Sequence, residues 1–179
     1  MERISNFLCF LFCFLVSNIA PAFAAQAQPI PLKEGINTIA LNQLQIHIIK
    51  GRVELMNAHS FDTYTMYITP NGANGAWLQV PFSNRTSPPD YFLNNAESAD
   101  SNIQSIDFYK KDNNLYVLRT TKFGLRAPEL NLKKTKVKFR TYKFNEDVDT
   151  PILLESEEKE SRTTWLNADE AAKFEGMGN

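Results

Sequence analysis

Apolar and polar side chains alternate along most of the chain, which is the pattern of β-strands with one buried face. The clearest case runs from Phe61 to Thr69, where Tyr64, Met66 and Ile68 fall on the same face. The same pattern predicts two short strands within 36–49, a turn at Gly51, and further strands at 52–56, 77–82, 103–109, 115–121, 135–144, 152–154 and 163–166.

Turn residues separate these strands. Residues 70–75 read Pro-Asn-Gly-Ala-Asn-Gly and predict a hairpin between the strands at 61–69 and 77–82. Residues 110–114 predict a second hairpin, and residues 83–100, which are rich in Asn, Ser, Pro and Asp, predict a long surface loop.

One helix is predicted near the end of the chain. Asn167 is a suitable N-cap, Glu170 stands at the position of a capping-box partner, and Gly176 ends the segment. Many short strands with one terminal helix indicate a mainly β protein, a single-domain antiparallel β-sandwich or barrel with a short C-terminal helix, over residues 36–179.

The first residues follow the pattern of a cleaved signal peptide. Ten consecutive apolar residues, Phe7 to Val16, come after Arg3 and before Ala22-Phe23-Ala24, which predicts cleavage of residues 1–24. A helix of ten residues spans only ~15 Å, half of a bilayer core, so no membrane anchor is expected after cleavage. Residues 25–35 are predicted to be a flexible leader, and the location is predicted to be periplasmic or, alternatively, secreted.

Composition narrows the range of partners. Both cysteines, Cys9 and Cys13, lie in the predicted signal peptide, so the core must be stable without disulfides. The net charge of −1 argues against nucleic acid. Residues 122–143 hold eight bases and one acid, whereas residues 146–160 hold seven acids and one base. The two segments either compensate each other or leave a basic patch for an anionic ligand or partner.

Residues 57–62, Asn-Ala-His-Ser-Phe-Asp, contain the residue types of a hydrolytic triad, namely His59, Ser60 and Asp62. Side chains so close together on a strand point to different faces, and Ser60 lacks a nucleophile-elbow motif, so hydrogen bonding at a strand entrance is the favoured interpretation. His47 and His59 are the only histidines, and no pattern of metal ligands joins them. Neither a catalytic set, a metal site nor a cofactor is therefore predicted.

A ligand or partner surface remains as the candidate site. Aromatic residues near the first hairpin and in the long loop could form it, and so could the polar residues at 57–62 or the basic face of the strand at 135–144. The candidates are His59, Asp62, Trp77, Tyr91, Phe92, Lys136, Lys138 and Arg140.

Residues 57–67, followed by Trp77 and Pro81-Phe82, resemble the periplasmic carbapenem self-resistance proteins. The resemblance implies a non-enzymatic protein that gives intrinsic resistance to carbapenems without hydrolysing them, together with a second periplasmic resistance protein. It supplies no catalytic residues that could be transferred to positions of this chain.

Three functional hypotheses follow. The first is an exported, non-enzymatic binding protein for a small ligand or a protein partner, which agrees with the resemblance. The second is a structural or adhesive β domain at the cell surface that uses the long loop and an exposed strand edge. The third is a periplasmic hydrolase that uses His59 and Asp62.

Overall fold

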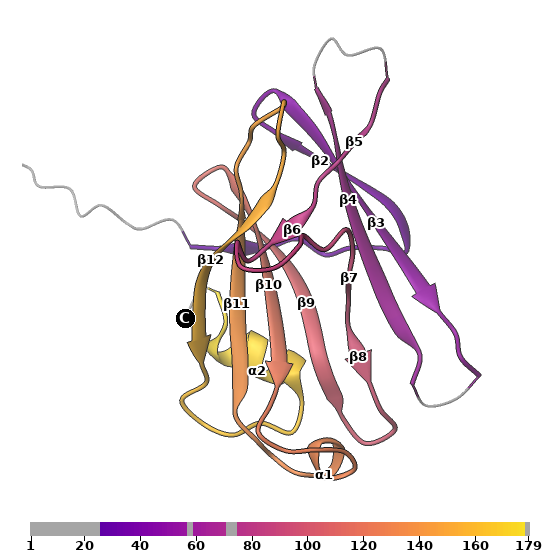
Figure 1. The fold of residues 1–179 in the computed structure, drawn as a ribbon, viewed down its shortest axis with the longest axis vertical. Helices are drawn as coiled ribbons and strands as arrows, with labels where there is room; N and C mark the ends of the chain where they lie inside the picture. The colour runs from indigo at the N-terminus through magenta and orange to yellow at the C-terminus, as the bar shows by residue number, and fades with distance from the viewer. Residues whose placement is uncertain (1–25, 57–58, 71–74, 178–179) are drawn as a thin grey trace, which may run out of the picture.

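The computed structural model describes residues 26–56, 59–70 and 75–177 (Figure 1). Within these residues, the strands form a five-stranded and a seven-stranded sheet that pack on each other. The two sheets are separate layers, so the β-sandwich is confirmed and the barrel alternative is not the one that the chain adopts.

The five-stranded sheet is formed by the first half of the domain. Its order is β2-β3-β4-β5, and β7 also pairs with β4. Its strands are β2 (Gly35–Leu41), β3 (Leu44–Val53), β4 (Phe61–Pro70), β5 (Leu78–Gln79) and β7 (Leu93–Asn94). All pairings in this sheet are antiparallel.

The seven-stranded sheet is formed mainly by the second half. Its order is β1-β9-β10-β11-β12-β6, and β8 also pairs with β9. Its strands are β1 (Gln28–Pro29), β6 (Phe82–Ser83), β8 (Ala96–Glu97), β9 (Asn102–Lys111), β10 (Asn114–Lys122), β11 (Val137–Phe144) and β12 (Leu153–Glu160). Only the short β6–β12 pairing is parallel among the pairings described.

The main core lies between the two sheets, as the alternation predicts. One sheet contributes the buried face of β3 and β4, for example Ile46 and Met66, and the other contributes residues such as Phe108, Val117 and Phe144. A second, smaller cluster lies on the opposite face of the seven-stranded sheet, where α2 (Ala168–Glu175) packs against β9 and β10. Figure 1 shows this helix in yellow against the seven-stranded sheet.

Three local predictions need correction. Gly51 is not a turn, because β3 continues through it and pairs with β4 as far as Val53. Of the predicted strand at 77–82, only Leu78 and Gln79 pair with β4, since the chain then crosses to the other sheet and pairs with β12 through β6. The predicted strand at 163–166 is reduced to a single bridge between Trp165 and Thr135.

The long loop at 83–100 carries structure that its composition does not reveal. β7 and β8 lie within it, and they pair with β4 and β9 respectively. This segment therefore joins the two sheets along one side of the sandwich. A short helix that the sequence analysis does not predict, α1 (Glu129–Leu132), lies between β10 and β11.

The C-terminal helix is confirmed, but its predicted capping is wrong. Asn167 occupies the N-cap position without a side-chain cap hydrogen bond, because its Oδ1 accepts a hydrogen bond from the Asn102 backbone N–H at 3.0 Å. The side chain therefore ties the helix to the start of β9. Gly176 ends the helix, as predicted.

The described part of the predicted flexible leader is attached to the domain. β1 pairs with β9, and the Ile30 N–H donates to the Phe108 carbonyl at 2.8 Å. The predicted signal peptide, residues 1–24, lies outside the described residues. In the part of the chain that the structure describes, no helix is long and apolar enough to cross a membrane.

Candidate functional site

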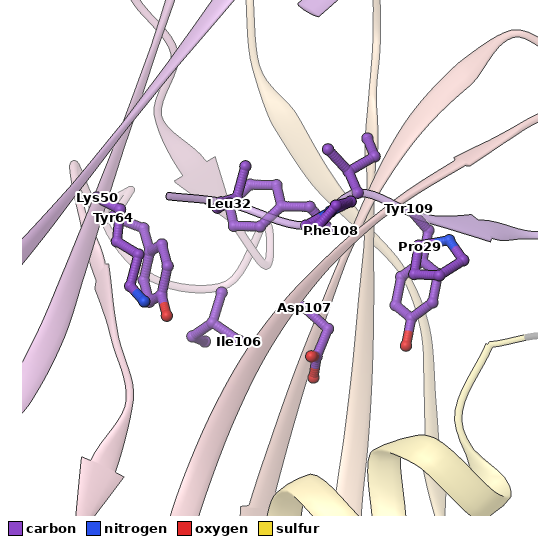
Figure 2. A pocket seen from close by; sticks show the side chains of 10 residues that line it. Pro29, Leu32, Lys50, Tyr64, Ile106, Asp107, Phe108 and Tyr109 are labelled. Atoms are coloured by element: carbon purple, nitrogen blue, oxygen red, sulfur yellow. The ribbon is translucent and has the colours of Figure 1, made fainter. Parts of the chain in front are cut away.

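A pocket of 540 Å³ lies at the seam between the two sheets (Figure 2). We call it the seam pocket. It exists because the leader segment passes over β9 while β3 and β4 of the other sheet stand on its opposite side. It is lined by Pro29, Ile30, Pro31, Leu32, Lys50, Tyr64, Ile106, Asp107, Phe108 and Tyr109.

The wall of the seam pocket is divided into an apolar and a polar part. Ile106, Phe108 and Leu32 supply apolar surface. Figure 2 shows the polar ends of Lys50, Tyr64, Asp107 and Tyr109 directed to the same side. Apolar walls with a few convergent polar groups are typical of small-molecule sites.

Asp107 is the acidic residue in the lining of this pocket. It is half-buried, and its Oδ2 accepts a hydrogen bond from the Ser105 hydroxyl at 3.1 Å. Burial raises the pKa of the carboxyl group, Ser105 lowers it, and Asp169 on α2 raises it further. Lys173 of α2 lines an adjoining pocket together with Asp107 and Asp169.

The tyrosines beside Asp107 remain neutral near physiological pH. Burial, with a contribution from Asp107, raises the pKa of Tyr109 to about 12. Burial also raises the pKa of Tyr64, and Asp62 adds to that shift. The Tyr109 phenol can therefore donate a hydrogen bond, whereas the Tyr64 phenol already has Asp62 as a hydrogen-bond partner.

At the other end of the pocket, Lys50 belongs to a group of paired charges around Asp62. Asp62 lies between two cations, with its Oδ2 3.1 Å from Lys50 Nζ and its Oδ1 3.1 Å from Arg52 Nη1. Burial raises the pKa of Asp62, but the hydrogen bonds from Lys50 and Arg52 lower it below its usual value. Asn95 fixes the strand here, because its Oδ1 accepts from the Asp62 N–H at 2.6 Å.

Two of the three candidate triad residues, Ser60 and Asp62, have partners outside the triad. The Ser60 hydroxyl donates to Glu54 at 2.9 Å, and Asp62 is bound to Lys50 and Arg52. His59 lies exposed in the turn before β4. The geometry favours the hydrogen-bonding interpretation of Ser60 and Asp62.

Trp77 and His47 form an aromatic stack outside the core. Their ring centroids are 4.2 Å apart and their planes differ by 2°. The imidazole lies between two hydroxyls, with Nδ1 3.0 Å from Thr38 Oγ1 and Nε2 3.0 Å from Thr69 Oγ1. Trp77 is nevertheless 42% exposed, so its indole ring is both fixed and accessible.

Four exposed apolar residues follow the outer edge of β4: Trp77, Leu78, Tyr91 and Phe92. We call them the β4-edge patch. The first two belong to the segment that reaches β4 through β5, and the other two precede β7, which pairs with β4 farther along. Gln79 joins the two segments, because its Nε2 donates to the Tyr91 carbonyl at 2.9 Å. Exposed aromatic residues are enriched at protein interfaces.

The basic candidates are mostly paired within the chain. Arg140 and Lys138 both contact Glu158 on β12, at 2.7 and 2.9 Å. Lys136 donates to the carbonyls of Ser161 and Arg162. The neighbouring strands thus bring the basic and acidic segments together, as the compensation hypothesis expects.

A smaller pocket of 240 Å³ lies beside this ion pair. Lys138 and Arg140 line it together with Arg119, Thr121 and Phe123. Its three cations could attract an anion. Such a site would be weak, because Glu158 already pairs with two of the cations, Lys138 and Arg140.

Sequence reasoning missed the residues of the seam pocket. Asp107 was within a predicted strand, and an aspartate between Ser105 and Tyr109 on one strand face was the available signal. The leader and β4 contributions had no such signal, since they depend on tertiary packing. Among residues 26–56, 59–70 and 75–177, no group of three or more His, Cys, Asp or Glu side chains is placed to hold a metal ion.

A solved structure has a fold similar to that of this chain. The chain is similar to a protein described as "Crystal structure of CarG", with a TM-score of 0.66 and 20% identity over 85% of this chain and 99% of the other. A comparison with curated proteins gave no significant match.

A family model gives the more specific result. The model of the family described as "Carbapenem resistance protein CarG-like" matches residues 32–164, from the leader through the last strand of the sandwich. This match confirms the resemblance found at residues 57–67 and extends it to most of the chain. The chain belongs to the CarG-like family of carbapenem resistance proteins.

Proposed function

We propose that this protein is exported to the periplasm and contributes to carbapenem resistance by binding, without hydrolysing the drug. The observation that carries the proposal is the family match over residues 32–164. Export is supported by the signal-peptide pattern of residues 1–24.

The partners of the polar groups support a non-hydrolytic role. In a hydrolytic triad, the serine nucleophile is hydrogen-bonded to a histidine base that a third group orients. Ser60 instead donates to Glu54, and the ring nitrogens of His47 contact threonine hydroxyls. The carboxylate of Asp62 is engaged by two cations.

The proposed partner is a second periplasmic resistance protein, and the β4-edge patch is the proposed contact surface. Trp77, Tyr91 and Phe92 are residue types enriched at interfaces, and each is more than two-fifths exposed. Gln79 holds the two parts of the patch in a fixed relation. A rigid surface reduces the entropy cost of association.

The test is the carbapenem susceptibility of a sensitive bacterium that expresses the full chain or a chain without residues 1–24. The drug concentration in the medium is followed alongside, with and without the second resistance protein. We expect protection by the full chain alone or with its partner, no protection by the shortened chain, and an intact drug. Protection with loss of drug would contradict the non-hydrolytic role, and protection by the shortened chain would contradict export.

A further inference from the structure

The inner face of the seven-stranded sheet changes from apolar to basic along β10 and β11. Ile106, which is buried in the core between the sheets, lies directly opposite Arg119, so their side chains share that face. On the next strand, Arg140 lies opposite Arg119, and Lys138 lies opposite Thr121. Figure 1 shows β3 and β4 diverging from β10 and β11 toward the bottom of the view.

The pocket of 240 Å³ that these polar side chains line together with Phe123 is called here the basic pocket. Two of its cations already have an acid, because Glu158 contacts Lys138 at 2.9 Å and Arg140 at 2.7 Å. Arg119 differs from them. Within residues 26–56, 59–70 and 75–177, no carboxylate lies within ion-pair distance of its guanidinium.

The order of the strands explains why Arg119 is left without an acid. The acids beside Lys138 and Arg140 on this face belong to β12: Glu155, Glu158 and Glu160. Arg119 is on β10, two strands and therefore about 10 Å away from β12. On its other side, β9 contributes the neutral residues Gln104 and Ile106 to the face.

Neutral groups hold the Arg119 guanidinium in place. Its Nε donates to Gln104 Oε1 at 3.1 Å, and the Tyr142 hydroxyl is a second hydrogen-bond partner. The Thr121 hydroxyl also donates to Gln104 Oε1, at 3.1 Å, which fixes the acceptor. Because a guanidinium has five N–H donors, Arg119 keeps donors for a further acceptor. The planar fork of arginine suits a carboxylate, which it can bind through two parallel hydrogen bonds.

Two further features favour an anion with an apolar part. Arg119 and Arg140 lie directly opposite each other, and like charges in this position destabilise a sheet, so an anion bound between them would remove a cost. Phe123 adds an aromatic ring to the lining, two positions beyond Thr121 on the same face. The volume of 240 Å³ is below the range of about 300–1,000 Å³ for drug-sized ligands, which favours a small compound or one part of a larger one.

We propose that the basic pocket binds the carboxylate of a small ring compound, with the carboxylate on Arg119 and the ring against Phe123. The carboxylate belongs either to a carbapenem, which carries one on its bicyclic ring, or to another small ring compound. This inference goes beyond the proposed resistance role, because the site binds a carboxylate whether or not the drug is its source.

The test is a titration of the protein with benzoate, followed by backbone amide shifts in NMR at about pH 7, where a carboxylic acid is ionised. We expect saturable shifts at residues 119–123 and 138–140. Matched titrations use benzyl alcohol, which is neutral, and benzylamine, which is a cation. Equal responses to all three probes would overturn the proposal.

Arg119→Gln removes the charge and the fork, and should weaken benzoate binding by about tenfold, as expected for the loss of one charge-assisted contact. Arg119→Lys keeps the charge without the fork and should bind with an intermediate affinity. Arg126→Gln, at an exposed position outside the pocket, is the matched control and should bind like the original protein. The amide spectrum checks that each variant is folded, and unchanged binding by a folded Arg119→Gln protein would overturn the proposal.

A final arm separates the two sources of the carboxylate. Tebipenem, a carbapenem with a free carboxylate, is compared with its pivaloyloxymethyl ester, in which the carboxylate is masked. Binding of the free acid alone, weakened by Arg119→Gln, would assign the pocket to the drug. Binding of benzoate but not of tebipenem would assign it to another ring compound. Absence of saturable binding by benzoate and by tebipenem would overturn the proposal, while the resistance measurements would stand unaffected.

Discussion

The indole of Trp77 lies flat on the imidazole of His47, with ring centroids 4.2 Å apart. His47 is on β3, whereas Trp77 belongs to the segment that enters β5. The stack therefore holds the crossing segment against the five-stranded sheet next to Tyr67, whose ring centroid is 5.8 Å from that of Trp77. It also positions one end of the β4-edge patch.

Trp77→Ala should lower the free energy of unfolding by about 1–2 kcal/mol, less than for a buried tryptophan because Trp77 is partly exposed. Urea unfolding followed by circular dichroism measures the change. Trp77→Phe, which keeps a ring over His47, should recover about half of the loss. An unchanged midpoint for Trp77→Ala would show that the stack does not stabilise the sheet.

Truncation of Phe82 and truncation of Phe92 should differ strongly in their effect on stability. Phe82 is 2% exposed and packs edge-on against Tyr142, so Phe82→Ala should cost about 3–5 kcal/mol of stability. Phe92 is 55% exposed, so Phe92→Ala should change stability by less than about 0.5 kcal/mol.

If the β4-edge patch is the partner surface, Phe92→Ala should still weaken binding of the second resistance protein, by about tenfold for a central interface residue. Surface plasmon resonance measures this affinity. Ile36→Ala, at an exposed apolar position on the far strand β2, is the control. Equal affinities of the two variants would show that the β4-edge patch is not part of the interface.

Asp62→Asn should destabilise the protein by about 1–3 kcal/mol near neutral pH, because it leaves Lys50 and Arg52 without their shared acceptor. Asp62 has a lowered pKa in the folded chain, so its contribution is present above the ordinary value of 3.8 and is lost as the pH falls through the folded value. Stability below that pH should converge for the variant and the original protein. Persistent divergence in acid unfolding curves would contradict this.

The hydrolase hypothesis makes a different prediction for the same residue. A folded Asp62→Asn protein should keep its carbapenem protection if Asp62 serves only the ion cluster. Susceptibility at a growth temperature well below the unfolding midpoint measures this. Loss of protection in the folded variant would show that Asp62 has a functional role beyond the ion cluster.

Glu175 should make the C-terminal helix sensitive to acid. Burial raises its pKa, but hydrogen bonds from the Arg162 N–H, the Trp165 indole and Thr163 lower it to about 2. Because the folded value lies below the ordinary value of 4.5, the stabilisation is present above 4.5 and is lost as the pH falls toward 2.

Glu175→Gln should therefore reduce stability at neutral pH and flatten its dependence on pH between these two values. Thermal unfolding at a series of pH values measures both effects. Glu170→Gln, at an exposed position on the same helix, is the control and should leave the profile unchanged. A profile for Glu175→Gln that matches the original protein would contradict the assignment.

The sequence by itself determined the strands with strict alternation. In β4, every second side chain enters the core, so the hydrophobic pattern alone specifies which face is buried. In β11, this pattern is interrupted at the register shift between Thr141 and Tyr142, and Tyr142 lies in the core. The helix after Asn167 and its end at Gly176 were also predicted, but the predicted cap does not form, because the Asn167 side chain accepts a hydrogen bond from the Asn102 N–H instead.

Only the tertiary structure decided the rest. Whether Gly51 turns or continues a strand depends on the partner β4, and the β7 and β8 pairings depend on strands from two different sheets. The seam pocket combines residues 29–32, β3, β4 and β9, which are separated by up to about eighty residues in the chain. Periodicity describes a residue's own element, whereas a pocket is defined by the elements that pack around it, so Asp107 became a candidate only in the folded chain.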